Sequence, residues 1–189
     1  IKAKSLLSWQ IPIITSSEHM KSRILSINKK FLYNELENFE VLLIPGFQGI
    51  NNKGELTTLG RGGSDTSAVA VAAAMETECI IYTDVEGVFT TDPNIVPKAK
   101  KINKISYEEM LELASQGAKV LQTRSVELAM RKNTKLSVRS SFIPKKIGTM
   151  ITDEKSVLEN NTGRYEKTNC LFFRCSYGFC DFRYFYNPT

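Results

Sequence analysis

Three observations predict an α/β fold for this sequence, a three-layer αβα sandwich with a mostly parallel central sheet. Short continuous apolar runs at 41–44 and 79–82 are typical of buried parallel strands. The small apolar run 68–75 between them indicates a tightly packed helix. Polar or glycine-rich loops follow both strands, so strand, loop, helix and strand alternate. In open sheets of this kind, ligands collect at the carboxyl ends of the strands.

The chain of 189 residues has the composition of an ordinary globular protein, since 42% of its residues are hydrophobic and 24% are charged. This composition excludes disordered and collagen-like proteins. No apolar run approaches the roughly 20 residues that span a bilayer, and Ile1–Lys4 lacks the features of a signal peptide. We therefore expect a cytoplasmic protein without a membrane partner. A start at Ile1 rather than at Met indicates a piece of a longer protein.

Charge and cysteine usage argue against nucleic-acid and metal binding. The net charge is +5, but the lysines are scattered and lack interleaved aromatic residues, so solvated surface explains them better than a nucleic-acid site. Cys79 lies in an apolar run, where a free cysteine is usually a small core residue. Cys170, Cys175 and Cys180 fit no common zinc spacing, and the single histidine, His19, is distant in sequence. No metal site in the protein itself is predicted.

The first third of the chain is predicted to form short strands and one helix. The run Leu6–Ile14, bent at its proline, indicates an edge strand, and 23–27 indicates another. A helix is expected at 29–39. Turn residues at Asn51–Gly54 predict a hairpin that delivers the chain to a glycine-rich loop. This loop and the loop Gly46–Gly49 should meet over one site.

The second half contains two predicted helices and the last strands of the sheet. Ser106–Glu109 forms a capping-box sequence that opens a helix, which Gly117 ends. Thr123 is expected to cap a second helix that runs through Arg131. Further strands are expected at 136–139 and 148–152. From about Asn160 the chain is rich in cysteine and aromatic residues, and no periodic element fits it.

The stretch Thr57–Ser67 is the candidate binding loop. Its three glycines allow backbone conformations and close approaches that a Cβ forbids, so amide groups can turn toward an anion: Gly60, Gly62 and Gly63. The next three residues are good N-cap residues for the following helix: Ser64, Asp65 and Thr66. Arg61 adds a planar fork suited to a carboxylate or phosphate. The loop therefore indicates an anionic substrate at a helix N-terminus, or else only a tight turn before a buried helix.

Neither the Walker A nor the dinucleotide glycine pattern is present in this loop. Two other polar segments could share its site. Thr83 and Asp84 follow the buried strand at 79–82, at the edge where the glycine loop is expected. Lys119 stands between a helix-ending glycine and an apolar pair, so its ammonium group could point back toward the site. The alternatives are plain connection for the loop and ordinary solvation for the lysine.

Four ordered blocks resemble the signatures of aspartate kinases, in the amino-acid kinase superfamily. They are Thr57–Asp65, Tyr82–Val88, Thr91–Pro93 and Gly117–Leu121, and the resemblance, nearest to bacterial enzymes, covers about 6–153. It implies transfer of the ATP γ-phosphoryl group to the side-chain carboxylate of L-aspartate, giving 4-phospho-L-aspartate. This reaction opens lysine, threonine, methionine and diaminopimelate biosynthesis. The resemblance also implies Mg²⁺ carried by the nucleotide, and a homo-oligomer if the full-length chain is made.

The resemblance also implies roles for individual residues. Four of them would hold the aspartate: Arg61, Gly62, Gly63 and Ser64. Asp65 would be catalytic by organising the phosphate end, and Lys119 by reaching the ATP phosphates. The nucleotide would be lined by Thr83, Asp84, Phe89, Asn94 and Lys119. Asn94 stands where these enzymes usually have an arginine, so one nucleotide contact should be weaker or lost.

The sequence departs from the resembled enzymes at both ends. Their Lys-Phe-Gly-Gly-type loop and an upstream acidic aspartate-binding residue do not precede Ile1, so we expect an N-terminally incomplete fold. Residues 1–153 are assigned to the C-terminal part of a kinase domain, and 154–189 to an atypical Cys/aromatic-rich tail that is not a regulatory domain. The alternatives are a non-catalytic or degraded remnant of such a kinase, or another amino-acid kinase such as a glutamate kinase.

Overall fold

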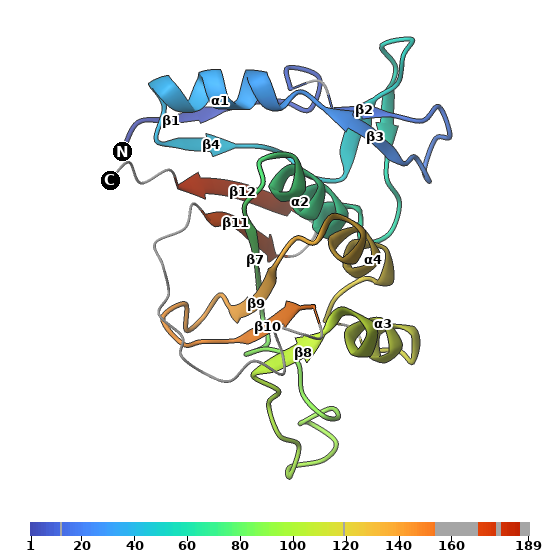
Figure 1. Cartoon of the computed structure of the whole chain (residues 1–189), viewed down its shortest axis with the longest axis vertical. Helices are drawn as coiled ribbons and strands as arrows, with labels where there is room; N and C mark the ends of the chain where they lie inside the picture. The colour runs from blue at the N-terminus through green and yellow to red at the C-terminus, as the bar shows by residue number, and fades with distance from the viewer. Residues whose placement is uncertain (12, 119, 154–169, 177–178, 186–189) are drawn as a thin grey trace.

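The computed structural model describes residues 1–11, 13–118, 120–153, 170–176 and 179–185, the last two segments as backbone only (Figure 1). The predicted α/β class is confirmed, with helices and strands alternating through the middle of the chain. One buried core joins the N-terminal part of the chain to the rest, because side chains that are distant in sequence belong to the same cluster, among them Leu42, Val71, Ile81 and Val138. None of the helices within the described segments is long and apolar enough to cross a membrane.

The main sheet has the strand order β12-β11-β7-β9-β10-β8. Its central strand β7 (Glu78–Thr83) is parallel to β9 (Leu136–Ser140) on one side and to β11 (Cys170–Ser176) on the other. The strand β10 (Thr149–Thr152) is antiparallel to β9 and parallel to β8 (Lys104–Ser106). The apolar residues of β7 are buried, as a central parallel strand requires.

The N-terminal half forms two smaller sheets beside the main one (Figure 1). In the first, β1 (Ala3–Ser5) pairs in parallel with β4 (Val41–Leu43), against which α1 (Lys29–Asn38) packs. The second has the order β3-β2-β5-β6 and contains the remaining strands of this half: β2 (Ile13–Thr15), β3 (Ile24–Ile27), β5 (Gln48–Ile50) and β6 (Leu56–Thr58).

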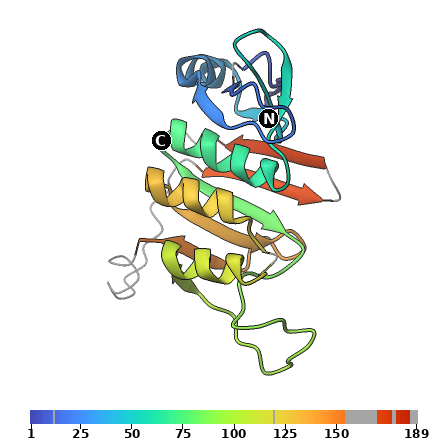
Figure 2. The same cartoon turned by 90° about the vertical axis from the view of Figure 1, so that its right-hand side faces the viewer.

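Three helices cover one face of the main sheet (Figure 2). They are α2 (Gly63–Ala74), α3 (Tyr107–Ser115) and α4 (Thr123–Lys132), and α4 contacts both of the others. Most side chains of α2 are small and buried, so this helix lies close to the sheet and to its neighbours. Cys79 is fully buried beneath this layer, and burial raises the pKa of its thiol, as expected of a core cysteine.

The two strands near the C-terminus lie between the halves of the molecule. β11 pairs with β7, and β12 (Phe179–Phe185) is antiparallel to β11 and contacts β4. The sequence indicated no element here, because its cysteines and aromatic residues neither alternate strictly nor repeat at helical spacing. Residues 154–169 lie outside the described part of the chain, and the assignment of 154–189 to a tail stays a prediction.

Most predicted elements are confirmed. The errors lie at helix ends and in one predicted strand, and the strands β1, β8, β11 and β12 were not predicted. The capping box is present, with Ser106 Oγ accepting from the Glu109 N–H at 3.2 Å. The hairpin between β5 and β6 also forms as expected. Thr123, however, is the first helical residue and Gln122 is the N-cap. The strand predicted over Leu6–Ile14 is confined to β2, and turns precede it.

Candidate active site

The carboxyl end of β7 and the start of α2 lie at the same edge of the main sheet. The 12-residue helix is about 18 Å long and the six-residue strand about 20 Å, and a tight turn reverses the chain between them. The strand therefore ends where the helix began. β9 is parallel to β7 and ends at the same edge, which Figure 2 shows at the arrowheads of the two strands.

The glycine loop enters α2 through two glycines with left-handed backbone angles. Gly60 has φ +79° and Gly62 has φ +68°, conformations that strain any residue with a Cβ. The Gly63 N–H donates to the Gly60 carbonyl at 2.9 Å, which closes the turn around Arg61. Arg61 itself is exposed. The loop thus holds an arginine side chain in solvent on a backbone of fixed shape.

The N-cap of α2 is Gly62, so the prediction of Ser64, Asp65 or Thr66 as N-cap is wrong. These residues lie inside the first turn, where Thr66 Oγ1 donates back to the Gly62 carbonyl at 3.0 Å. In the described chain, no side chain accepts a hydrogen bond at this cap. A helix start without a side-chain cap leaves its amide donors and positive dipole end available for an anion.

The loop after β4 meets the glycine loop, as the sequence predicted. The Phe47 N–H donates to Ser67 Oγ at 3.0 Å, and the Phe47 carbonyl accepts from the Leu59 N–H at 3.0 Å. A Cβ on Gly63 would lie 2.9 Å from Cδ2 of the Phe47 ring. Phe47 has φ +73° and is 40% exposed, so a strained aromatic residue forms one wall of the site.

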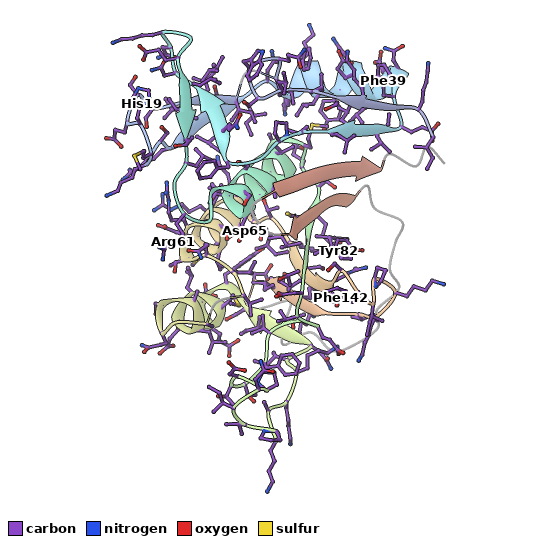
Figure 3. All side chains as sticks on the ribbon, turned by 180° about the vertical axis from the view of Figure 1, so that it is seen from behind. His19, Phe39, Arg61, Asp65, Tyr82 and Phe142 are labelled. Atoms are coloured by element: carbon purple, nitrogen blue, oxygen red, sulfur yellow. The ribbon has the colours of Figure 1, made fainter. Side chains whose placement is uncertain are left out.

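Asp65 faces the segment that precedes α4. Burial raises the pKa of its carboxyl from 3.8 to about 6, and a hydrogen bond from the Gln122 backbone N–H opposes the rise. Figure 3 shows Arg61 and Asp65 near the same end of α2. The site therefore combines an exposed guanidinium with a carboxyl whose charge is costly without a cationic partner.

The ends of β7 and β9 are joined at this edge by Ser141. Its N–H and its hydroxyl both donate to the Thr83 carbonyl, at 2.8 and 3.0 Å. Thr83 Oγ1 in turn donates to the carboxylate of Asp84 at 3.0 Å, and Asp84 is exposed. The two residues predicted on the nucleotide side thus form one hydrogen-bonded pair on a fixed strand end.

Phe89 and Asn94 lie on a long excursion between β7 and β8, which protrudes at the bottom of Figure 1. Phe89 is partly buried at its base, whereas Asn94 is exposed, with its N–H bonded to the Asp92 carboxylate at 2.8 Å. Thr149 closes the base of this excursion, since its Oγ1 accepts from the Val88 N–H at 2.8 Å and donates to the Ile102 carbonyl at 2.5 Å. The two predicted nucleotide residues therefore lie on one loop, Phe89 at its base and Asn94 farther from the sheet.

Lys119 lies outside the described residues, but the chain on either side of it is placed. Ala118 N–H donates to the Leu113 carbonyl at 2.9 Å, which ends α3. The Gln122 side chain packs against Gly62, where a Cβ would overlap it. The segment that contains Lys119 therefore returns the chain from α3 to the glycine loop.

Four residues at this edge were not found by sequence reasoning: Phe47, Gln122, Arg124 and Ser141. The loop of Phe47 was expected at the site, but nothing in the sequence marked its positive φ. The other three act through long-range contacts that no local pattern encodes. Arg124 is an example, because its guanidinium donates to the Leu59 carbonyl, 65 residues away in sequence, at 2.8 Å.

This combination of a parallel sheet, a glycine loop at a helix start and polar strand ends is typical of α/β proteins that bind an anion at one sheet edge. The chain belongs to the amino acid kinase family, whose model matches residues 1–140.

Curated relatives agree with this assignment. The chain is 53% identical over 161 residues to the aspartokinase of Rickettsia felis, covering 85% of this chain and 40% of that protein. It is 50% identical to the aspartate kinase of Pseudomonas putida, over 84% of this chain and 39% of that protein. The chain thus spans about two fifths of the length of these relatives.

Solved structures share the fold. The aspartate kinase from Synechocystis is 42% identical with a TM-score of 0.67, over 86% of this chain and 26% of that chain. Aspartokinase III from E. coli, in complex with aspartate and ADP, has a TM-score of 0.73 over 98% of this chain and 49% of that chain. At 24% identity, this second structure supports the fold alone.

Proposed function

We propose that this chain carries the aspartate-binding and part of the nucleotide-binding machinery of an aspartate kinase. The reaction is transfer of the γ-phosphoryl group of ATP to the side-chain carboxylate of L-aspartate, giving 4-phospho-L-aspartate. The observation that carries the proposal is the exposed guanidinium of Arg61 on a rigid glycine loop at an open helix start. Relatives named aspartokinase and aspartate kinase, which are 53% and 50% identical to this chain, support the choice of substrate.

The substrate side of the site meets an electrostatic demand, because both reactants are anions. Arg61 offers a planar fork to a carboxylate, while the amides of Gly62 and Ser64 offer oriented donors at the helix start, where the Gly63 N–H closes the turn on the Gly60 carbonyl. These groups bring the two anions together and stabilise charge that spreads in the transition state. No general base is required, because a carboxylate is already ionised and nucleophilic at neutral pH.

The nucleotide side lies along the ends of β7 and β9. Thr83 and Asp84 are fixed there, and Phe89, Asn94 and Lys119 would complete the site from the excursion and from the segment before α4. Within the described part of the chain, no three acidic, histidine or cysteine groups gather as metal ligands. Mg²⁺ would arrive on the phosphates of the nucleotide, with Asp65 as a nearby carboxyl that organises the phosphate end.

The wider setting follows from the proposed activity. The product would enter lysine, threonine, methionine and diaminopimelate biosynthesis, in the cytoplasm, and the complete chain would form a homo-oligomer. Two alternatives make different predictions. A non-catalytic remnant would bind nucleotide at most, and a glutamate kinase would phosphorylate glutamate in place of aspartate.

A segment exchange tests the proposal directly. Residues 1–153 would replace the matching segment of the Rickettsia felis aspartokinase, and acyl phosphate would be trapped with hydroxylamine. We expect ATP-dependent hydroxamate from aspartate and none from glutamate. A soluble, folded exchange protein that makes no aspartyl hydroxamate would support the remnant, and product from glutamate would support the glutamate kinase. The unmodified relative is the matched control.

A further inference from the structure

Arg124, the second residue of α4, binds two segments that are distant in sequence. Its Nη1 donates to the Leu59 carbonyl at 2.8 Å, and its Nη2 donates to the Ser22 carbonyl at 3.4 Å. The Ser22 N–H donates to the Thr58 carbonyl at 3.1 Å. One guanidinium thus holds the backbone of the β2–β3 connection beside the residues that lead into the glycine loop.

The position of Arg124 is unfavourable for the helix itself. A cation in the first turn faces the positive end of the helix dipole, and the first turn of α4 has no acidic residue to offset it. The other cations at helix ends of α4 are Arg131 and Lys132, which occupy the favourable last turn. The contacts of Arg124 with Leu59 and Ser22 therefore account for its placement better than helix stability does.

These contacts fix the backbone immediately before Arg61. Leu59 has both of its backbone groups bonded, the N–H to Phe47 and the carbonyl to Arg124. The next residue, Gly60, turns the chain with φ +79°. Rotation of the peptide group between Leu59 and Gly60 would change the direction of this turn. The hydrogen bond from Arg124 to the Leu59 carbonyl therefore fixes the position of the Arg61 backbone.

The residue before α4 holds the other side of the same loop. The Gln122 side chain fills the space beside Gly62, and its backbone N–H donates to the Asp65 carboxylate. The first turn of α4 therefore contacts the glycine loop before and after Arg61. Because the same chain continues back through 117–121, this turn links the loop to the segment that contains Lys119.

We propose that Arg124 is a positioning residue for aspartate binding: it orients the Leu59 peptide so that Arg61 and the start of α2 face the substrate carboxylates. This inference rests on the proposed function for its substrate. The geometric part, that Arg124 orders the loop, is independent of any activity.

Hydrogen exchange on the intact chain tests the geometric part. In Arg124→Met, amides in peptides covering 57–65 should exchange about tenfold faster or more, because a charge-assisted hydrogen bond is lost. Arg131→Met is the matched control, since Arg131 is exposed and, among the residues that the structure describes, forms its ion pair with Glu127 on the same helix. Unchanged exchange at 57–65 in Arg124→Met would overturn the inference, whatever the protein's activity.

Kinetics in the exchange protein test the functional part. Arg124→Met should raise KM for aspartate about tenfold or more, with KM for ATP within about threefold. In Arg124→Lys, KM for aspartate should lie between the values of the parent and of Arg124→Met, because an ammonium group keeps the charge but lacks the fork that reaches two carbonyls. A fall in kcat with KM for aspartate unchanged would indicate a merely structural role and overturn the inference. Absence of activity in the unmodified exchange protein would instead count against the proposed function.

Discussion

Arg61 is exposed, yet the backbone that carries it is held on both sides, an arrangement expected of a binding residue rather than of a solvated one. We predict that Arg61→Ala lowers kcat/KM for aspartate by on the order of a hundredfold or more, because a charge-assisted bidentate contact is lost. The hydroxamate assay with varied aspartate measures the effect. Arg131→Ala is the control and should retain full activity. Full activity in Arg61→Ala would remove this residue from the site.

Asp65 makes the free energy of unfolding depend on pH. Its folded pKa of about 6 exceeds the ordinary 3.8, so the folded state binds more protons than the unfolded state between these values. Stability therefore falls as pH rises from about 4 to 6, by about 3 kcal/mol, and stays lower at neutral pH. A cation beside Asp65 would reduce this loss, because it favours the charged carboxylate.

Asp65→Asn should remove this contribution while keeping an acceptor for the Gln122 N–H. We expect the variant to be more stable than the parent at pH 7.5 and equal to it near pH 4, and to have little kinase activity. Urea unfolding across this pH range is the measurement. Parallel stability curves for the two proteins would contradict the shifted pKa.

At the level of single elements, α3 depends on its capping box. Ser106 accepts from the Glu109 N–H, and Glu109 Oε2 accepts from the Ser106 N–H at 3.0 Å. Ser106→Ala should lower the free energy of unfolding by about 1 kcal/mol, which lowers Tm by about 2–4 °C in a chain of this size. Ser115→Ala removes a hydroxyl that donates to the Glu112 carbonyl at the exposed end of α3, and should stay within about 0.5 kcal/mol of the parent. Equal losses in the two variants would argue against the cap.

The elements differ in how well their sequences predict them. Buried strands such as β7, and the capping box of α3, are encoded by neighbouring residues, so local patterns suffice. The N-caps Gly62 and Gln122 were missed because neither makes a side-chain cap hydrogen bond, so the backbone angles rather than the side-chain type determine where these two helices start. The contacts of Arg124 and Ser141 could not be predicted, since each depends on chain segments tens of residues away.

For the molecule as a whole, β11 and β12 complete the sheet. Five residues of β11 pair with β7, and β12 reaches β4, so the two strands join the N-terminal half to the main sheet. Ending the chain at residue 153 would expose an edge of the central strand, which favours aggregation. We expect this truncated chain to unfold at lower temperature and to oligomerise, as measured by calorimetry and light scattering. Removal of residues 186–189 alone is the control, and an equally stable monomer ending at 153 would contradict the role of these strands.

The excursion between β7 and β8, whose base Thr149 closes, divides the strands of the main sheet into two groups along the chain. A single cut among the exposed residues 92–98 would give one fragment ending with β7 and another containing β8 through β12. β7 would then be flanked on both sides by strands of the second fragment. The two pieces would pair along the main sheet, so the protein could be reconstituted from separate halves, the first carrying Arg61, Thr83 and Asp84 and the second carrying Ser141 and the segment before α4.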